Sequence, residues 1–285
     1  ILTNTVLNYA FIFGKLGCPA MGVRGAALAT VISAAVSMGM NMAFSYGMHL
    51  PAGARPSEWL RQEKGFAGRF SKTVVPVIFN EGLWGVGTTM YSVFYGRMGD
   101  AAVATMGVCT TINDLVWVAI FALMNATAII VGKALGAGDR ERAYLYAKRM
   151  MAGAVAAGVA LGLLVIAVRW PLVNIFSGLS YPVREKAQFI LMLGALTIWF
   201  RAFNTINIVG VLRSGGDTLF SLCLDVGTLW LVGVTSTGLA ALVFHWPLEW
   251  VYACTFLEEA VKMAVGIPHF KKRQWMNVLT EQPQG

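Results

Sequence analysis

Charged residues are scarce in this 285-residue sequence, at 13% of the chain, whereas 57% of the residues are hydrophobic. The mean hydropathy of +0.64 excludes an ordinary soluble domain and predicts an integral membrane protein. Acidic residues are scarcer than basic ones, which leaves a net charge of +8. Because the basic residues cluster at the ends of apolar runs, where they set orientation in a membrane, we expect no nucleic-acid partner.

Cysteine and histidine are scarce as well. The four cysteines lie far apart without a Cys-x-x-Cys pair, and the three histidines are scattered near the ends of the expected helices. We therefore expect the cysteines to be buried as small core residues, and we expect no metal site and no cofactor. A signal-peptide pattern is missing too, because the chain opens at Ile1 within an apolar run. We interpret the chain as a fragment without its N-terminal part.

Apolar runs long enough to cross a bilayer follow one another along the chain, separated by short polar segments. They predict an all-α integral membrane protein, a polytopic helix bundle with seven complete crossings and one partial helix. Residues 49–69 instead combine proline, glycine and mixed charge, which indicates an extramembrane linker between two lobes. The expected organisation is 1–48 for the last two helices of a first lobe, 49–69 for the linker, 70–275 for a six-helix lobe and 276–285 for a tail.

Basic residues are distributed unequally between the two sides of the expected bundle. Fourteen lysines and arginines fall on the side of the linker and the C-terminus, and six fall on the other side. Because the richer side of a membrane protein faces the cytoplasm, we expect the linker and the C-terminus to be cytoplasmic.

The run between residues 70 and 95 carries Glu81 near its middle. A carboxylate at this depth in a bilayer is costly, so it should face the bundle interior or a wet cavity, and it indicates a functional site. Pro76 lies one turn before the glutamate, and Gly82 and Gly85 follow it, so we expect a hinge in a helix that moves during transport. We predict that Glu81 binds a cation or a proton. The expected cavity around it is lined by Asn80, Trp84, Thr88 and Tyr95.

Asp114 is a second acid in the middle of an apolar run, and its helical face gathers Asn113, Trp117 and Phe121. Two helices adjacent in sequence, each with a central acid and a row of aromatic rings, predict a cavity that holds a cation. Each aromatic face would add a cation–π attraction of ~0.5–2 kcal/mol. The alternative is structural: the acids accept hydrogen bonds between helices, and the rings pack.

Arg201 also falls near the middle of a membrane span, with Asn204 and Asn207 on the same helix. An arginine at this depth should pair with an acid or line water. A standing ion pair with Glu81 or Asp114 would count against the predicted ion site. The two asparagines suit either the lining of a cavity or hydrogen bonds between helices.

The last expected span carries Glu258, Glu259 and Lys262, and Asp225 opens the span before it. Because Glu258 and Lys262 are four residues apart, they suit an ion pair within one helix, and we interpret these charges as structural. We therefore place the ion site on the helices of Glu81 and Asp114.

Four segments of the chain, in order, closely resemble the multidrug and toxic compound extrusion (MATE) transporters, and more narrowly the branch common in anaerobic bacteria. They are LNYAFIFGKLGCPAMGVRGAALATVIS, PVIFNEGLWGVG, AIIVGKALGAGDRERAYLYAKR and NIVGVLRSGGDT. The resemblance extends from Leu2 to about Leu279. Four such segments with matching helix spacing are specific to the family, although no single motif is decisive.

Members of that family have twelve helices in two six-helix lobes, so the resemblance implies that this chain keeps helices five to twelve. It also implies a secondary active antiporter, not an enzyme, that exports cationic or amphipathic drugs in exchange for Na⁺ or H⁺. Glu81 matches the acid that many members carry on helix seven for cation binding. Some members carry a further acid on helix ten, where this chain reads RAFNTIN, and Asp114 on helix eight is the expected substitute. We expect organic cations and membrane lipids as partners, a monomer, and a location in the bacterial inner membrane.

Three other functions are weighed against drug export. A lipid-linked precursor flippase of the same superfamily would line its cavity with several bases, whereas this cavity offers mainly acids, aromatic rings and Arg201. An intramembrane aspartyl protease needs Tyr-Asp and Gly-x-Gly-Asp, but Asp114 follows an asparagine and the segment ending at Asp217 reads Ser-Gly-Gly-Asp. A channel or a structural subunit would show no dependence on an ion gradient.

Overall fold

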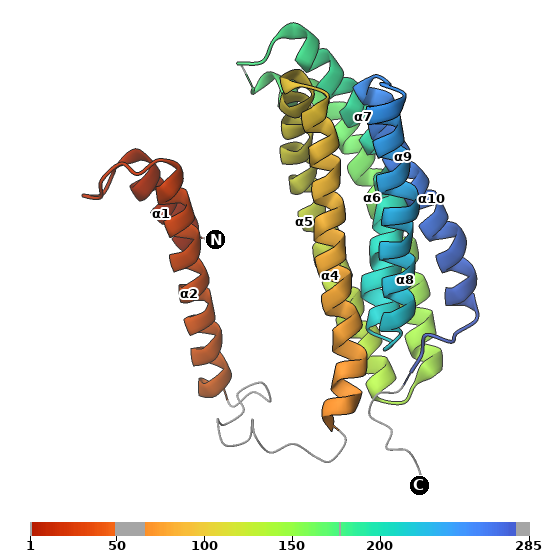
Figure 1. Cartoon of the computed structure of the whole chain (residues 1–285). Helices are drawn as coiled ribbons and strands as arrows, with labels where there is room; N and C mark the ends of the chain where they lie inside the picture. The colour runs from red at the N-terminus through yellow and green to blue at the C-terminus, as the bar shows by residue number, and fades with distance from the viewer. Residues whose placement is uncertain (1, 49–65, 177, 278–285) are drawn as a thin grey trace. The chain divides into compact units, whose positions relative to one another are not determined.

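A computed structural model of the chain describes residues 2–48, 66–176 and 178–277, and Figure 1 shows their helices. These residues are helical apart from short turns, and no strand occurs among them. They divide into two compact units between Ala67 and Gly68. The expected all-α helix bundle is confirmed, with two helices in the first unit and a six-helix bundle in the second.

The predicted limits of the linker and the tail fall mostly outside the described residues, which omit 49–65 and 278–285. Helix α4, Phe66–Arg97, begins inside the predicted linker, at Phe66 rather than at residue 70. The division into 1–48, 49–69, 70–275 and 276–285 otherwise stays a prediction.

The first unit is a hairpin of α1, Leu2–Phe13, and α2, Val23–Gly47. A Cβ atom at Gly25 would lie 2.6 Å from the carbonyl oxygen of Phe11, so the missing side chain lets the two backbones meet. Ala10 and Ala29 are buried as well. Small residues therefore hold this hairpin together.

The second unit contains six membrane-length stretches of helix. The first three are α4, Phe66–Arg97, α5, Asp100–Gly136, and α6, Arg140–Asn174. The fourth joins α7, Tyr181–Thr205, to the π-helical segment η1, Ile206–Arg213. The fifth consists of α8, Thr218–Thr228, η2, Leu229–Val234, α9, Thr235–Gly238, and η3, Leu239–Val243, and the sixth is α10, Leu248–Lys271.

Five stretches among the described residues are both long and apolar enough to cross a membrane. They are Val23–Gly47, Asp100–Gly136, Arg140–Asn174, Tyr181–Arg213 and Thr218–Val243. Helices α4 and α10 have similar lengths, but each carries charged side chains within the helix, which lower its hydropathy. The chain is thus a multi-pass membrane protein.

Helices α6 and α7 form the most extensive backbone contact of the bundle. A Cβ atom at Gly158 would lie 2.4 Å from Trp199 Cα, and one at Gly162 would lie 2.4 Å from the Ala195 carbonyl oxygen. Two glycines four residues apart on one face let the helices approach this closely, as small residues commonly do in membranes. Helices α6 and α7 are therefore the most closely packed pair of the unit.

Helix α4 is attached differently. It makes few close backbone approaches to the other helices, and its contacts are mainly between side chains. In Figure 1 α4 (orange) runs alongside α8 and α9 (cyan to blue), and a Cβ atom at Gly87 would lie 2.5 Å from Leu229 Cδ2 of η2. A helix held in this way can shift at lower cost than one packed backbone to backbone.

Candidate functional site

Lys262 of α10 lies at the centre of a buried group of charged side chains. Its Nζ is 2.8 Å from Asp225 Oδ1 on α8 and 2.5 Å from Glu258 Oε1, one turn earlier on α10. The three side chains are only 6–12% exposed. Because an isolated charge in an apolar interior is strongly disfavoured, such groups persist only when they are paired. The predicted pair of Glu258 and Lys262 is confirmed, and Asp225 joins it from another helix.

Arg213, the last residue of η1, connects this centre to α4. Its Nη1 donates to Glu81 Oε1 at 2.6 Å, and its Nη2 donates to Asn80 Oδ1 at 2.6 Å. The same Nη2 lies 3.8 Å from Asp225 Oδ2. The side chain of Glu81 is 58% exposed, whereas that of Arg213 is 13% exposed. Glu81 is therefore the point at which the buried group reaches the surface of the bundle.

Tyr91 of α4 contacts the opposite side of the group. Its hydroxyl donates to Glu258 Oε2 of α10 at 2.7 Å. Gly233 of η2 leaves room for this contact, because a Cβ atom there would lie 2.2 Å from the Tyr91 hydroxyl oxygen and 2.4 Å from Glu258 Oε2. π-helical segments such as η2 occur often at functional sites. Polar side chains thus hold α4 at two levels.

Glu259 forms a second branch with residues of α7. Its Oε1 lies 3.5 Å from Arg201 Nε, and its Oε2 accepts a hydrogen bond from Asn204 Nδ2 at 2.8 Å. Arg201 thus pairs with an acid of α10 rather than with Glu81 or Asp114. Asn204 bonds between two helices.

We call the seven charged residues of this group the charge network. It contains four acids and three bases, so the carboxylates outnumber the basic groups by one. Its members are Glu81, Asp225, Glu258, Glu259, Arg201, Arg213 and Lys262.

The ion pair with Arg213 bears directly on the predicted cation site at Glu81. A permanent basic neighbour at 2.6 Å holds this carboxylate and counts against its acting as a free ligand for a metal cation. Asp114 is exposed on α5, and among the described residues no hydrogen bond or ion pair joins it to Glu81. The cation-binding roles of both acids stay predictions.

The other predicted cavity residues differ in burial. Asn207 is fully buried on η1, and neither its Oδ1 nor its Nδ2 has a hydrogen-bond partner among the described residues. The rings of Trp117 and Phe121 lie 5.5 Å apart on α5. The buried members of the set are Asn80, Tyr95, Asn204 and Asn207, the partly buried ones are Thr88, Asn113, Trp117 and Arg201, and the exposed ones are Trp84 and Phe121.

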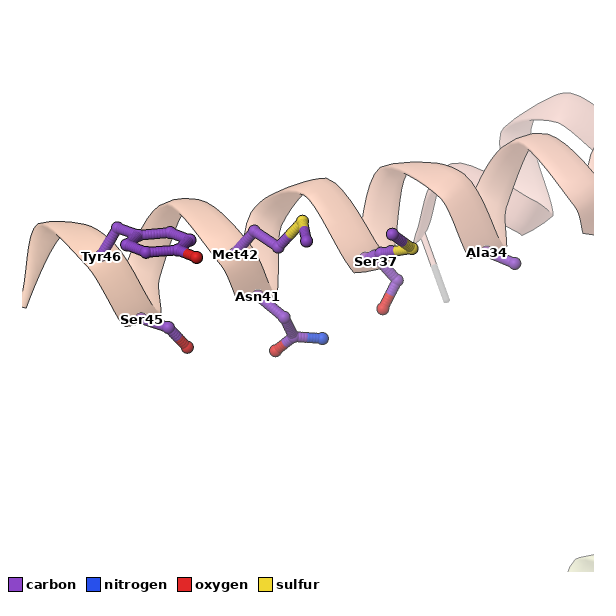
Figure 2. Close-up of a pocket in the computed structure, with 7 residues that line it drawn as sticks. Ala34, Ser37, Asn41, Met42, Ser45 and Tyr46 are labelled. Atoms are coloured by element: carbon purple, nitrogen blue, oxygen red, sulfur yellow. The ribbon is translucent and has the colours of Figure 1, made fainter. Parts of the chain in front are cut away.

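A hollow of about 540 Å³ lies along α2 in the first unit. Figure 2 shows Ser37, Asn41 and Ser45 pointing to the same side of this helix. Residues four apart share a helical face, so these side chains form a polar stripe. Sequence reasoning missed the stripe, although its spacing is visible in the sequence.

Sequence reasoning also missed Arg213 and Asp225 as parts of one site. Arg213 falls at the end of an expected span, where a base ordinarily sets orientation, but its side chain turns toward Glu81 on α4. The available signal was that acids and bases interrupt several apolar runs, and opposite charges at membrane depth are expected to pair.

Comparisons with known sequences give a consistent picture. A family model described as MatE matches residues 76–237. The probable multidrug resistance protein NorM of Thermotoga maritima is 25% identical over 230 residues, which cover 80% of this chain and 48% of that protein. The multidrug resistance protein MdtK of Yersinia pseudotuberculosis is 28% identical over 255 residues, which cover 85% of this chain and 53% of that protein. The chain thus spans about half the length of the curated relatives it matches.

Solved structures share the fold. A multidrug resistance MATE family transporter in an outward-facing conformation superposes with a TM-score of 0.81 at 18% identity, covering 98% of this chain and 61% of that one. A MOP superfamily transporter from Pyrococcus furiosus gives a TM-score of 0.78 at 17% identity, with the same coverage. At these identities the likeness concerns the fold alone.

Proposed function

Because the chain belongs to the MatE family, we propose that it serves in a secondary active antiporter that exports cationic or amphipathic drugs in exchange for Na⁺ or H⁺. The relatives named above are multidrug resistance proteins, and this chain is a multi-pass membrane protein. Members of the family are transporters, so no enzymatic reaction enters the proposal.

The charge network is the observation that supports an ion-coupled function. Ionisable groups inside a membrane protein are costly, and they commonly mark ion pathways and proton relays. The network has one acid more than it has bases, which suits the binding of one monovalent cation or one proton. Glu81 is its most exposed acid and is the proposed point of entry. Asp114 is exposed on α5, the helix that follows α4 in the sequence, and is the proposed second contact for a cation.

Binding at Glu81 would act through Arg213. Neutralising Glu81 weakens the attraction that holds the guanidinium at 2.6 Å, and Asp225, at 3.8 Å, then becomes its stronger partner. Helix α4 loses one polar link while it keeps the link at Tyr91.

We place the resulting bend of α4 at Pro76, Gly82 and Gly85. Pro76 removes a backbone donor inside the helix, and the glycines lower the cost of changing its curvature. The ion can shift the balance between inward-open and outward-open states only if it binds one of them more strongly.

The charge network also bears on the substrate. A flippase for lipid-linked precursors would need bases that are free to bind anionic groups. Within the network, Arg201, Arg213 and Lys262 each contact a carboxylate. This favours a cationic substrate over an anionic one.

The location of the protein belongs to the same proposal. We place it in a bacterial inner membrane as a monomer with a cytoplasmic C-terminus, because the bases are more numerous on that side.

The test is drug efflux by the protein expressed from its complete gene. We expect Glu81→Gln to abolish efflux of a cationic dye from cells while the purified protein keeps its thermal unfolding midpoint within a few degrees. Glu141→Gln is the matched control, because Glu141 is an exposed acid paired with Arg273 outside the charge network. Normal efflux by Glu81→Gln would contradict the coupling role of Glu81.

A further inference from the structure

We propose that Lys262 is a tethered cation that takes the place of a coupling metal ion in this bundle, so that the exchanged ion is H⁺ and not Na⁺. The inference rests on the proposed antiport function and selects between its two coupling ions. It concerns residues of α8 and α10, whereas the resemblance implies ion binding at Glu81 of α4.

The first step is the position of the ammonium group. Lys262 Nζ contacts Asp225 Oδ1 at 2.8 Å and Glu258 Oε1 at 2.5 Å, and the side chain is 6% exposed. A Na⁺ bound between these two carboxylates would place the same single positive charge at this position. Here the chain itself supplies that charge.

The second step is that every acid of the network already has a fixed cation beside it. Glu81 contacts Arg213 at 2.6 Å, and Glu259 contacts Arg201 at 3.5 Å. A metal ion at any of these acids would approach an existing positive charge in surroundings of low dielectric constant, where repulsion is strong. A metal ion would also need several oxygen ligands that are now bonded to the bases.

The third step is that a proton avoids the second of these obstacles, the need for several free oxygen ligands, whereas its charge is repelled by Arg213 as a metal ion would be. It binds a single oxygen and requires no coordination shell. Since the network has one acid in excess, one added proton makes it neutral and leaves a carboxylate for each base. The proton passes from a hydronium ion to a carboxylate oxygen of Glu81, the most exposed acid. One O–H bond of the hydronium ion breaks, one O–H bond forms on Glu81, and a water molecule is left.

Titratable or charged groups from five elements surround this centre. They are Glu81 and Tyr91 from α4, Arg201 from α7, Arg213 from η1, Asp225 from α8, and Tyr252, Glu258, Glu259 and Lys262 from α10.

The first experiment compares driving forces in proteoliposomes that contain the protein expressed from its complete gene. Uptake of ethidium is followed under a pH gradient without Na⁺, and then under a Na⁺ gradient at equal pH on both sides. We expect uptake under the pH gradient alone. Uptake under the Na⁺ gradient would overturn the inference and leave the antiport function standing, whereas no uptake under either gradient would overturn both.

The second experiment removes the tethered cation. In the unaltered protein we expect the same thermal unfolding midpoint in NaCl and in choline chloride of equal ionic strength. In Lys262→Met, two carboxylates lose their ammonium partner, and we expect NaCl to raise the midpoint above that in choline chloride by about 2–5 °C. Lys186→Met is the matched control, because Lys186 lies 3.9 Å from Glu249 and is 47% exposed.

Each outcome of this second experiment is decisive. A Na⁺-specific rise in the unaltered protein contradicts the inference, and so does a folded Lys262→Met variant that does not respond to Na⁺. If Lys262→Met does not fold, two measurements on the unaltered protein still test the inference. They are the comparison of NaCl with choline chloride and the comparison of uptake under the two gradients.

Discussion

Glu81 and Tyr91, ten residues apart on α4, are the two ends of one series of polar side-chain contacts. Glu81 contacts Arg213, and Tyr91 donates to Glu258. Asp225 and Lys262 connect Arg213 with Glu258, so the path runs through η1, α8 and α10. Ten residues of helix span about 15 Å. Helix α4 has few close backbone contacts, and these two links help to fix its position together with the packing of Phe94 and Tyr95 in the core. A change of charge at one end is therefore transmitted to the other through side chains that are already in contact.

The link at Tyr91 is tested by Gly233→Ala. The added Cβ atom would lie 2.2 Å from the Tyr91 hydroxyl oxygen and 2.4 Å from Glu258 Oε2, so the contact must open. We expect the free energy of unfolding to fall by about 1–3 kcal/mol and drug transport to fall with it. The measurements are the thermal unfolding midpoint and dye uptake by proteoliposomes.

Gly227→Ala is the matched control for this prediction. Gly227 lies six residues earlier in the same membrane-spanning stretch, and a Cβ atom there meets no atom within 4 Å. It should leave transport unchanged and raise stability by at most about 1 kcal/mol. Equal effects of the two substitutions would show that the Tyr91 link has no special importance.

The link at Glu81 is tested by a double-mutant cycle with Arg213. In Arg213→Gln, Glu81 and Asn80 lose the guanidinium that they share, and the network gains a second excess negative charge. We expect the free energy of unfolding to fall by about 1–3 kcal/mol. Adding Glu81→Gln restores the charge balance, so stability should return.

Transport separates the two roles that this ion pair can have. If the pair only supports the fold, the double variant recovers transport together with stability. We expect instead that stability returns while dye uptake remains at the background of empty vesicles, because the proton-accepting carboxylate is gone. Arg149→Gln, an exposed base outside the network, is the control and should change neither quantity.

The helices could be predicted from the sequence because an apolar run of bilayer length has no alternative to a helix that satisfies its own backbone. Helix α2, Val23–Gly47, for example, coincides with such a run. The ends of the helices were harder to predict from the sequence. Helix α4 begins at Phe66, because residues whose composition indicates an extramembrane segment also continue the helix.

The charge network could be predicted only in part. Charges at membrane depth are visible in the sequence, but their partners depend on which helices become neighbours. Arg213 pairs with Glu81, 132 residues away, and Arg201 pairs with Glu259, 58 residues away. Arg213 and Gly233 also lie in the π-helical segments η1 and η2, whose periodicity differs from that of a regular α-helix.

The proposed hinge of α4 is tested by Gly82→Ala and Gly85→Ala. A Cβ atom at either position meets no atom within 4 Å, so neither substitution creates a clash. Each should raise stability by up to about 1 kcal/mol, because alanine favours helix more than glycine does. If α4 bends at these positions during transport, the same stiffening should slow dye uptake although the protein is more stable. Gly68→Ala, on the same helix and equally free of contacts, is the control and should leave uptake unchanged. Uptake at the unaltered rate in both Gly82→Ala and Gly85→Ala would remove the hinge from the mechanism, since a stiffer segment could then serve equally well.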